Sequence, residues 1–158
     1  RASGTRLVVD TSGLPLAAAL KAGTFLVKPS LRELREVLQQ PLEHPADQCA
    51  AAQALVHSGQ TEMVALSLGA QGAVLATRDG VWQAPALDVS AARGTTGAGD
   101  CFLAALVWSL DRGAPPPEAL RWGMAAGAAA LLVPGTALAR ATDVHRLQSQ
   151  VIVRASPV

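Results

Sequence analysis

Tyrosine is absent from this sequence, and aromatic residues make up only 3% of its 158 residues. Charged residues are also few, at 16%, and they nearly balance, leaving a formal net charge of +1. The sequence has no cluster of lysine and arginine that would follow a phosphate backbone, so we expect no nucleic-acid partner. The scarcity of aromatic residues predicts a core of small aliphatic side chains, as in layered α/β proteins.

Long apolar runs and paired cysteines are missing as well. The most apolar stretch, residues 124–133, has about half the length that a bilayer requires, and it ends at Pro134. We therefore expect no membrane span, and the sequence shows no signal peptide. Cys49 and Cys101 lie in different expected helices without metal-ligand spacing, which favours reduced packing residues in a cytoplasmic protein.

Half of the residues are hydrophobic, and strand-like segments alternate with helix-like segments. This alternation predicts an α/β fold with a mostly parallel sheet and helices on both faces. A turn at Arg78-Asp79-Gly80 predicts an antiparallel hairpin at one edge of the sheet. No repeat or linker interrupts the pattern, so we expect a single domain over residues 1–158. The expected strands are residues 7–10, 24–27, 63–67, 73–76 and 81–87. The expected helices are residues 14–21, 46–57, 117–132 and 142–150. Two more helices are expected, one that is capped by Ser30 and one that runs from the glycine-rich stretch to about residue 110.

The sharpest chemical signal is Gly94-Thr95-Thr96-Gly97-Ala98-Gly99-Asp100, a glycine-rich turn that runs directly into a helix. The first amides of a helix have no partner within it, and with the helix dipole they form a site for an anion such as phosphate. A carboxylate would repel that phosphate, but it is useful if it accepts the proton of a hydroxyl that attacks the phosphate. The alternative is an ordinary helix start whose dipole Asp100 complements.

This stretch resembles the second signature of the PfkB (ribokinase-like) family of carbohydrate kinases, Thr-x-Gly-Ala-Gly-Asp at the start of a helix. Three further segments resemble motifs of the same family in the same order. Residues 28–33 are similar to its Lys-Pro-Asn-x-x-Glu motif, residues 67–72 to its nucleotide loop, and residues 125–127 with 135–136 to its adenine-side helix and turn. Asp10-Thr11-Ser12-Gly13 points to the phosphofructokinase and tagatose-phosphate kinase branch.

The resemblance implies the C-terminal half of a ribokinase-like three-layer α/β/α fold, which catalyses phosphoryl transfer from ATP to a sugar-phosphate hydroxyl. It favours a 6-phosphofructokinase that makes fructose 1,6-bisphosphate, with 1-phosphofructokinase and tagatose-6-phosphate kinase as alternatives. The N-terminal half, which in this family carries the lid, grips the sugar phosphate and forms the homodimer, is expected to be absent from this chain. A nucleotide-binding module without catalysis is the alternative from another class, whereas a Rossmann dehydrogenase is excluded because no Gly-x-Gly-x-x-Gly follows the first strand.

By the same resemblance, Asp100 is the catalytic base, and the amides of Gly97, Ala98 and Gly99 form the anion hole. Lys28 lies near the nucleotide phosphates, and Glu33 and Ser30 hold Mg²⁺ through its water shell. The carbonyls of Gly94, Thr96, Ala130, Val133 and Gly135 bind a monovalent cation, expected to be K⁺. The nucleotide is contacted by Ser67, Leu68, Gly69, Ala70, Gln71 and Gly72 in a loop, and its adenine by Met124 and Ala128.

Each of these residues also has a purely structural interpretation. Lys28 can be a surface lysine at a strand end, and Glu33 fits a capping box with Ser30. The glycines of residues 69–72 suit a tight turn, and Met124 suits a helix core. Two positions depart from the family pattern, because Ser30 replaces an asparagine and Gly94 replaces a small polar residue.

Overall fold

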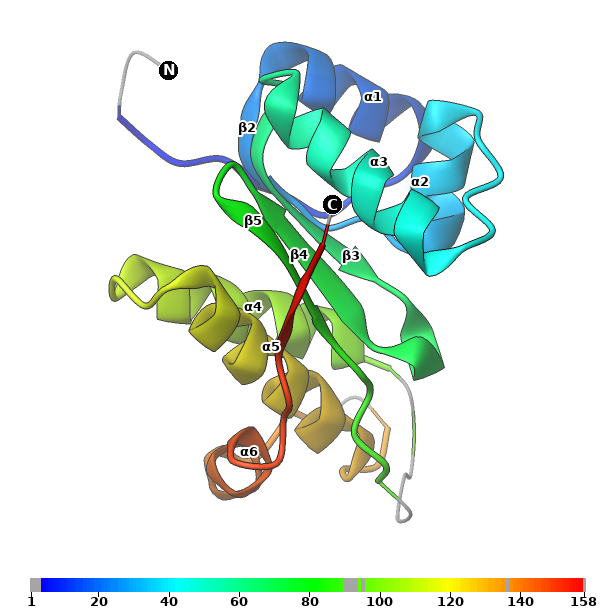
Figure 1. Ribbon diagram of the computed structural model, residues 1–158. Coiled ribbons are helices and arrows are strands. Elements are labelled where there is room, and N and C mark those ends of the chain that lie inside the picture. The colour runs from blue at the N-terminus through cyan, green and yellow to red at the C-terminus, as the bar shows by residue number, and fades with distance from the viewer. Residues whose placement is uncertain (1–3, 90–93, 95, 136, 158) are drawn as a thin grey trace. The chain divides into compact units, whose positions relative to one another are not determined.

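The computed structural model of the chain describes residues 4–89, 94, 96–135 and 137–157 (Figure 1). Strands and helices alternate along the first half, and three helices dominate the second half. The elements are β1 (Val8–Val9), α1 (Gly13–Ala22), β2 (Thr24–Val27), α2 (Leu31–Leu38), α3 (Pro45–His57), β3 (Thr61–Ser67), the short 3-10 helix η1 (Gly69–Gln71), β4 (Ala73–Thr77), β5 (Gly80–Ala84), α4 (Ala98–Asp111), α5 (Pro116–Leu131), α6 (Ala141–Gln148) and β6 (Arg154–Ser156).

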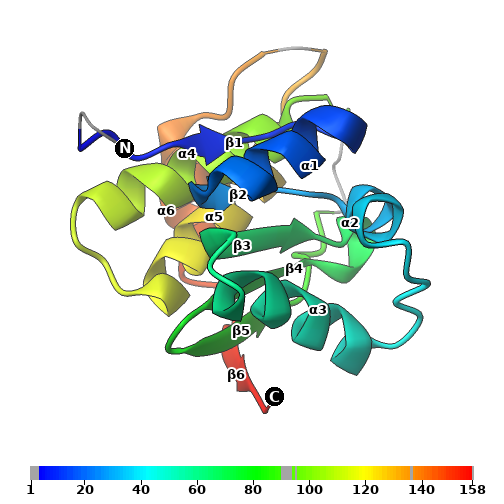
Figure 2. The ribbon, with the colours of Figure 1, turned by 90° about the horizontal axis from the view of Figure 1, so that it is seen from above.

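The strands form a six-stranded sheet in the order β1-β2-β3-β4-β5-β6. β1, β2 and β3 lie side by side and are parallel, with Val9 beside Val27 and Val27 beside Val64 (Figure 2). β4 and β5 are neighbours joined by a two-residue turn, and a connection of that length joins antiparallel strands. The sheet is therefore mixed, and its parallel part places the carboxyl ends of three strands at one edge.

The chain divides into two compact units. The first comprises Arg1–Leu68, Val74–Val81 and Ala155–Val158. Its core gathers leucine, valine and alanine side chains of α1, α2 and α3 on those of β2, β3 and β4. β2 is buried along its whole length, which explains why its sequence is a continuous apolar run without alternation. Most of the fully buried side chains here are aliphatic, as the scarcity of aromatic residues predicts.

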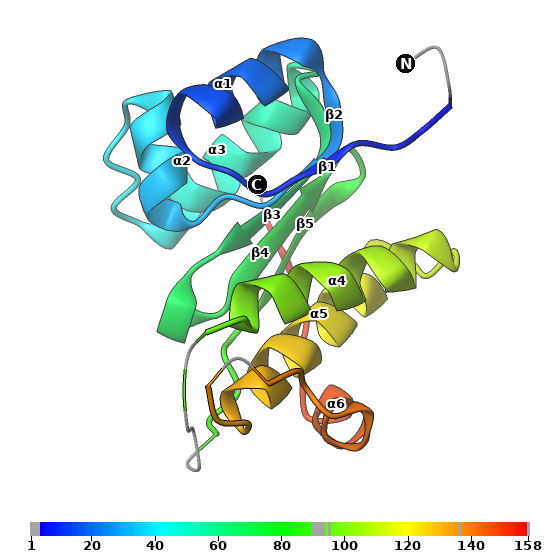
Figure 3. The ribbon, with the colours of Figure 1, turned by 180° about the vertical axis from the view of Figure 1, so that it is seen from behind.

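The second unit comprises Gly69–Ala73 and Trp82–Arg154. Within it α4 packs along α5, and α6 packs on α5 (Figure 3). The buried residues of α5 are mostly alanine and glycine, which leaves room for the larger buried side chains of α4, Phe102, Leu106 and Leu110. All three tryptophans of the chain belong to this unit, and the ring of Trp122 contacts both Trp108 and His145 in edge-to-face geometry. None of the described helices is long and apolar enough to span a bilayer.

The expected elements are found, although β1 covers only Val8–Val9 of the expected residues 7–10, and other parts of the sheet also differ. β5 ends at Ala84, before the expected end at Leu87, and Pro85 follows it, a residue that has no amide to donate to a neighbouring strand. The hairpin of β4 and β5 does not form the edge of the sheet, because β6 lies outside β5. β6 and η1 were not expected at all, since both are short and lack a period of apolar residues.

Candidate active site

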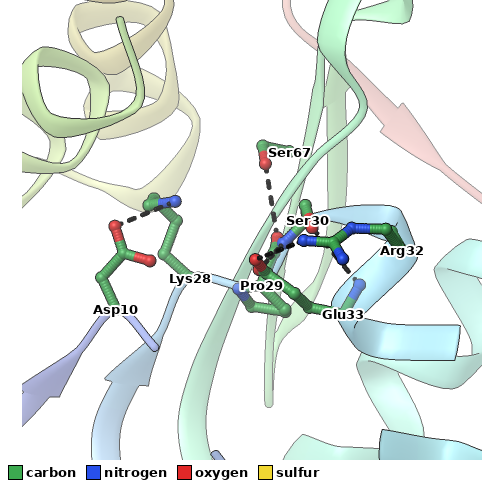
Figure 4. A network of polar contacts seen from close by, with 7 residues as sticks. All are labelled: Asp10, Lys28, Pro29, Ser30, Arg32, Glu33 and Ser67. Carbon is green, nitrogen blue, oxygen red and sulfur yellow. Dashed lines mark hydrogen bonds and ion pairs between the residues drawn. The ribbon is translucent and has the colours of Figure 1, made fainter. Parts of the chain in front are cut away.

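Lys28 follows the last residue of β2, at the carboxyl end of the parallel strands. Its side chain is only 9% exposed, and its Nζ lies 3.0 Å from Oδ2 of Asp10, which follows β1 (Figure 4). The amide of Lys28 donates to the carbonyl of Val9 at 3.0 Å, which ties the two strand ends together. The structure therefore excludes the interpretation of Lys28 as an exposed surface lysine.

Ser30 and Glu33 begin α2 as a capping box. The amide of Ser30 donates to Oε2 of Glu33 at 2.8 Å, and the amide of Glu33 donates to the Ser30 hydroxyl oxygen at 3.3 Å. The other carboxylate oxygen of Glu33 lies 3.8 Å from the guanidinium of the largely exposed Arg32. The capping interpretation is thus confirmed, and the carboxylate is 19% exposed and keeps lone pairs for further donors.

Ser67 joins this group from the end of β3. Its amide donates to the carbonyl of Pro29 at 3.0 Å, and its hydroxyl donates to the same oxygen at 3.4 Å. Ser30 and Ser67 form an isolated parallel bridge, so the Lys28–Glu33 segment is fixed to the residue that opens the expected nucleotide loop. The first unit thus brings Lys28, Ser30, Glu33 and Ser67 together, and Leu68 packs on its core.

The rest of the expected nucleotide loop belongs to the second unit. Gly69–Gln71 form one turn of 3-10 helix, and the amide of Gly72 donates to the carbonyl of Gly69 at 3.1 Å. Gly72 has a φ of +105°, and a Cβ placed there would lie 2.0 Å from the carbonyl oxygen of Ala84. The structural interpretation of this glycine is therefore correct, because no side chain fits between the two backbone segments.

The glycine-rich turn caps α4. Gly97 is the N-cap residue, with a φ of +81°, and Ala98, Gly99 and Asp100 form the first turn. The amide of Cys101 is the first to donate within the helix, to the carbonyl of Gly97 at 2.9 Å. No side chain caps the preceding amides, and Asp100 is exposed. This helix start thus places an exposed carboxylate beside amides that no side-chain cap covers, and the anion hole and the base stay predictions. Thr95 of the signature lies outside the described residues.

Two glycines of α5 fix the start of α4. A Cβ at Gly127 would lie 3.2 Å from the carbonyl oxygen of Ala98, and a Cβ at Gly123 would lie 3.0 Å from the carbonyl oxygen of Phe102. Met124 and Ala128, the expected adenine contacts, are both buried on the same helix, at 8% and 7% exposure. Their burial agrees with the core interpretation of these residues, and the adenine contact stays a prediction.

Carbonyl groups gather where α5 ends. A Cβ at Gly94 would lie 3.9 Å from the carbonyl oxygens of both Val133 and Gly135, so these three residues are neighbours, and their role as cation ligands stays a prediction. The carbonyl of Ala130 accepts the amide of Val133 at 3.4 Å within the end of the helix, and Thr96 lies in the turn before α4. Oxygen ligands of this kind suit a hard monovalent cation. Thr136 of the expected turn lies outside the described residues.

Sequence reasoning missed two features. Asp10 entered it only as part of a branch-specific motif and was not given a site role, although its carboxylate lies 3.0 Å from the ammonium of Lys28. The other feature is an apolar cavity of about 420 Å³ on the second unit, lined by α4, α5 and α6 with Trp108, Trp122 and His145 among its residues. His145 is thus a structural residue of that cavity, and no cluster of three metal-ligating residues is found in the described ranges.

Comparison with known proteins gives one consistent result. Residues 1–143 match the model of the pfkB family of carbohydrate kinases. The chain is 44% identical over 146 residues to ATP-dependent 6-phosphofructokinase isozyme 2 of Mycobacterium tuberculosis H37Rv, covering 92% of this chain and 42% of that protein. It is 36% identical over 129 residues to 1-phosphofructokinase of Haemophilus influenzae, covering 82% and 41%. The crystal structure of Escherichia coli phosphofructokinase-2 with potassium superposes with a TM-score of 0.90 and 37% identity, over 94% of this chain and 48% of that one.

Proposed function

Because the chain belongs to the pfkB family of carbohydrate kinases and has its ribokinase-like α/β fold, we propose that it is the nucleotide-binding and catalytic portion of an ATP-dependent sugar-phosphate kinase. The chain spans less than half of the two curated relatives named above, so the activity belongs to the proposal for the whole protein. The observation that carries the proposal is the start of α4, where amides without a side-chain cap and the exposed carboxylate of Asp100 share one helical turn.

In the proposed reaction, a hydroxyl oxygen of the sugar phosphate attacks the γ-phosphorus of ATP. The hydroxyl proton passes to the carboxylate of Asp100 while the new P–O bond forms. The bond between the γ-phosphorus and the bridging oxygen breaks, and ADP leaves with that electron pair. The amides at Gly97, Ala98 and Gly99 stabilise the negative charge on the transferred group, and their fixed positions in the helix start avoid a cost of reorganisation.

The described residues also fit the expected ions. Mg²⁺, when bound to the nucleotide, neutralises the charge of the phosphates, and it keeps several waters. The carboxylate of Glu33 and the hydroxyl of Ser30 are partly accessible and suit donors from such waters, since each keeps acceptor capacity beyond the capping box. For the monovalent cation we propose K⁺, bound by backbone carbonyls near Gly94, Val133 and Gly135, which are neighbours.

For the acceptor we propose fructose 6-phosphate, phosphorylated to fructose 1,6-bisphosphate. Support comes from the relative named 6-phosphofructokinase isozyme 2, which has the higher identity and the wider coverage of this chain. The relative named 1-phosphofructokinase supports fructose 1-phosphate as the second candidate acceptor. In the family that the chain resembles, the N-terminal half grips the sugar phosphate, so we expect that half to select the acceptor.

The test is phosphoryl transfer by the full-length protein that contains this sequence. Turnover is measured with ATP and each of fructose 6-phosphate, fructose 1-phosphate and tagatose 6-phosphate, and then repeated with Asp100→Asn. Loss of the base is expected to lower kcat by about 10²–10⁴ with little change in nucleotide affinity. The matched control is Asp111→Asn, at the opposite end of α4, which is expected to leave kcat unchanged. An Asp100→Asn variant with wild-type turnover would refute the role of Asp100 as the base. Nucleotide binding without any turnover by the unchanged protein would instead favour a non-catalytic nucleotide-binding module.

A further inference from the structure

Asp10 and Lys28 face each other because of the register of two parallel strands. Val8 lies beside Leu26 and Val9 beside Val27, so the next residues of the two strands, Asp10 and Lys28, are also abreast. Residues abreast on parallel strands point to the same side of a sheet. The hydrogen bond from the Lys28 amide to the carbonyl of Val9 holds this register at the strand ends. The backbone register thus places the two side chains side by side, so that the carboxylate of Asp10 is within reach of the ammonium of Lys28.

Burial makes this pair more than a surface contact. The Lys28 side chain is 9% exposed, and an ammonium this far from water requires a charged partner. Oδ2 of Asp10 supplies that partner at 3.0 Å. A lysine side chain has four carbons and several rotamers, and fixing them costs conformational entropy. The carboxylate compensates that cost before any ligand arrives.

The pair also has an open side. The side chain of Asp10 is 33% exposed, whereas that of Lys28 is almost covered. Both residues lie at the carboxyl ends of their strands, and open α/β sheets bind their ligands at that edge. Ser30 and Glu33 of the capping box follow Lys28 directly in the chain and are linked to the end of β3 by Ser67 (Figure 4). The ammonium of Lys28 therefore lies beside the solvent-accessible carboxylate of Asp10, and hydrogen bonds fix the backbone that follows Lys28.

We propose that Asp10 is a positioning residue that holds the ammonium of Lys28 in the place from which it contacts the phosphates of the nucleotide. This inference rests on the proposed function, because it requires Lys28 to bind those phosphates. Asp10 itself does not touch the reacting atoms in this scheme. It keeps the buried lysine charged and fixes its direction, so that less freedom is lost when the nucleotide binds and reacts.

Two other roles for Asp10 make different predictions. A carboxylate that serves only the fold stabilises the protein, and its loss lowers the free energy of unfolding without a selective effect on ATP kinetics. A carboxylate that acts on the nucleotide only by charge repels the phosphates, and its removal raises the affinity for ATP. A positioning role predicts instead that the loss is transmitted through Lys28 and disappears when Lys28 is replaced.

The experiment is a double-mutant cycle in the full-length protein with Asp10→Asn, Lys28→Met and the double variant. Asparagine keeps the shape of Asp10 without its charge, and methionine is an apolar side chain of similar length that suits the buried position of Lys28. We expect Asp10→Asn to lower kcat/KM for ATP by about 5- to 30-fold. This loss is near the lower end of the range for losing a hydrogen bond to a charged group, because Asp10 is partly exposed and water screens its charge. In the Lys28→Met background, Asp10→Asn is expected to cause no further loss.

The controls separate positioning from folding. Asp79→Asn, an exposed aspartate in the turn between β4 and β5, is expected to leave kcat/KM unchanged. Asp10→Glu keeps the charge on a longer side chain and is expected to retain more activity than Asp10→Asn. Circular dichroism and thermal unfolding establish that each variant is folded. Should Asp10→Asn alone fail to fold, the comparison of Asp10→Glu with and without Lys28→Met gives the same test.

Each outcome decides between the proposals. Wild-type kinetics for Asp10→Asn, or an equal loss with and without Lys28, would overturn the positioning role. Unchanged ATP kinetics for Lys28→Met would overturn it as well, because the lysine would then not contact the nucleotide. The proposed kinase function is tested separately by Asp100→Asn, so a protein that depends on Asp100 and Lys28 but not on Asp10 would refute only this inference.

Discussion

Replacement of Gly72 by alanine is expected to disrupt the loop that follows β3 far more than other replacements of glycine with positive φ. A Cβ at this position would lie 2.0 Å from the carbonyl oxygen of Ala84 and 2.8 Å from the amide nitrogen of Ala86. Both atoms belong to the backbone, so they cannot rotate away as a side chain does. The loop and the segment after β5 must therefore move apart for an alanine to fit.

The magnitude follows from two contributions. A residue other than glycine at a φ of +105° costs about 1–3 kcal/mol in backbone strain. Insertion of a methyl group into a closely packed site costs about 1–3 kcal/mol more. We expect Gly72→Ala to lower the free energy of unfolding by about 2–6 kcal/mol, the range of the two contributions taken together.

Two matched variants isolate the steric contribution. Gly69, in the same loop, has a φ of +59°, and Gly59, in the turn before β3, has a φ of +78°, and neither has an atom within 4 Å of a placed Cβ. Alanine at these positions is expected to cost only the left-handed conformation, about 1–2 kcal/mol. The assay is urea denaturation of the full-length protein, together with titration of ATP. Equal destabilisation by Gly72→Ala and Gly69→Ala would refute the close approach of the two backbone segments.

Two further predictions concern α5. One tests its contact with the start of α4, and the other tests the backbone carbonyls near its C-terminal end. Gly127→Ala gains about 1 kcal/mol of helix propensity, but its Cβ would lie 3.2 Å from the carbonyl oxygen of Ala98 and press on it. We therefore expect kcat to fall while the midpoint of unfolding changes little. A variant with unchanged kcat would contradict the view that α5 sets the position of the anion site. Gly94→Ser is expected to change stability by less than about 0.5 kcal/mol and to keep activation by K⁺, because a Cβ there has ordinary contacts of 3.9 Å with the two carbonyls. Activation is measured by titration of K⁺ against Na⁺, and its loss would contradict the view that a side chain is tolerated at this position.

Local signals predicted the helices, the capping box and the glycine-rich turn well. The capping box of Ser30 and Glu33 and the turn before α4 depend on residues close in sequence, so their pattern is sufficient. By contrast, the ion pair of Asp10 and Lys28 depends on the register between β1 and β2, which no local pattern specifies. The strand Arg154–Ser156 is short and has no buried residue, so it pairs through its position at the sheet edge and not through an apolar period. The burial of Met124 likewise depends on how the helices pack, which the local sequence does not specify.

The departure at Ser30 separates the capping role from the expected role in binding Mg²⁺. Asparagine, which the family pattern has here, caps helices as well as serine does, so Ser30→Asn is expected to change the free energy of unfolding by less than about 0.5 kcal/mol. Ser30→Ala removes the acceptor of the Glu33 amide and is expected to cost about 1 kcal/mol. If Ser30 also accepts from the waters of Mg²⁺, both variants shift the Mg²⁺ concentration that gives half-maximal activity, although only Ser30→Ala is destabilised. Activity is titrated with Mg²⁺ at saturating ATP, and urea denaturation is measured in parallel. A shift confined to Ser30→Ala would indicate that Ser30 affects the metal only through the position of Glu33 in the capping box.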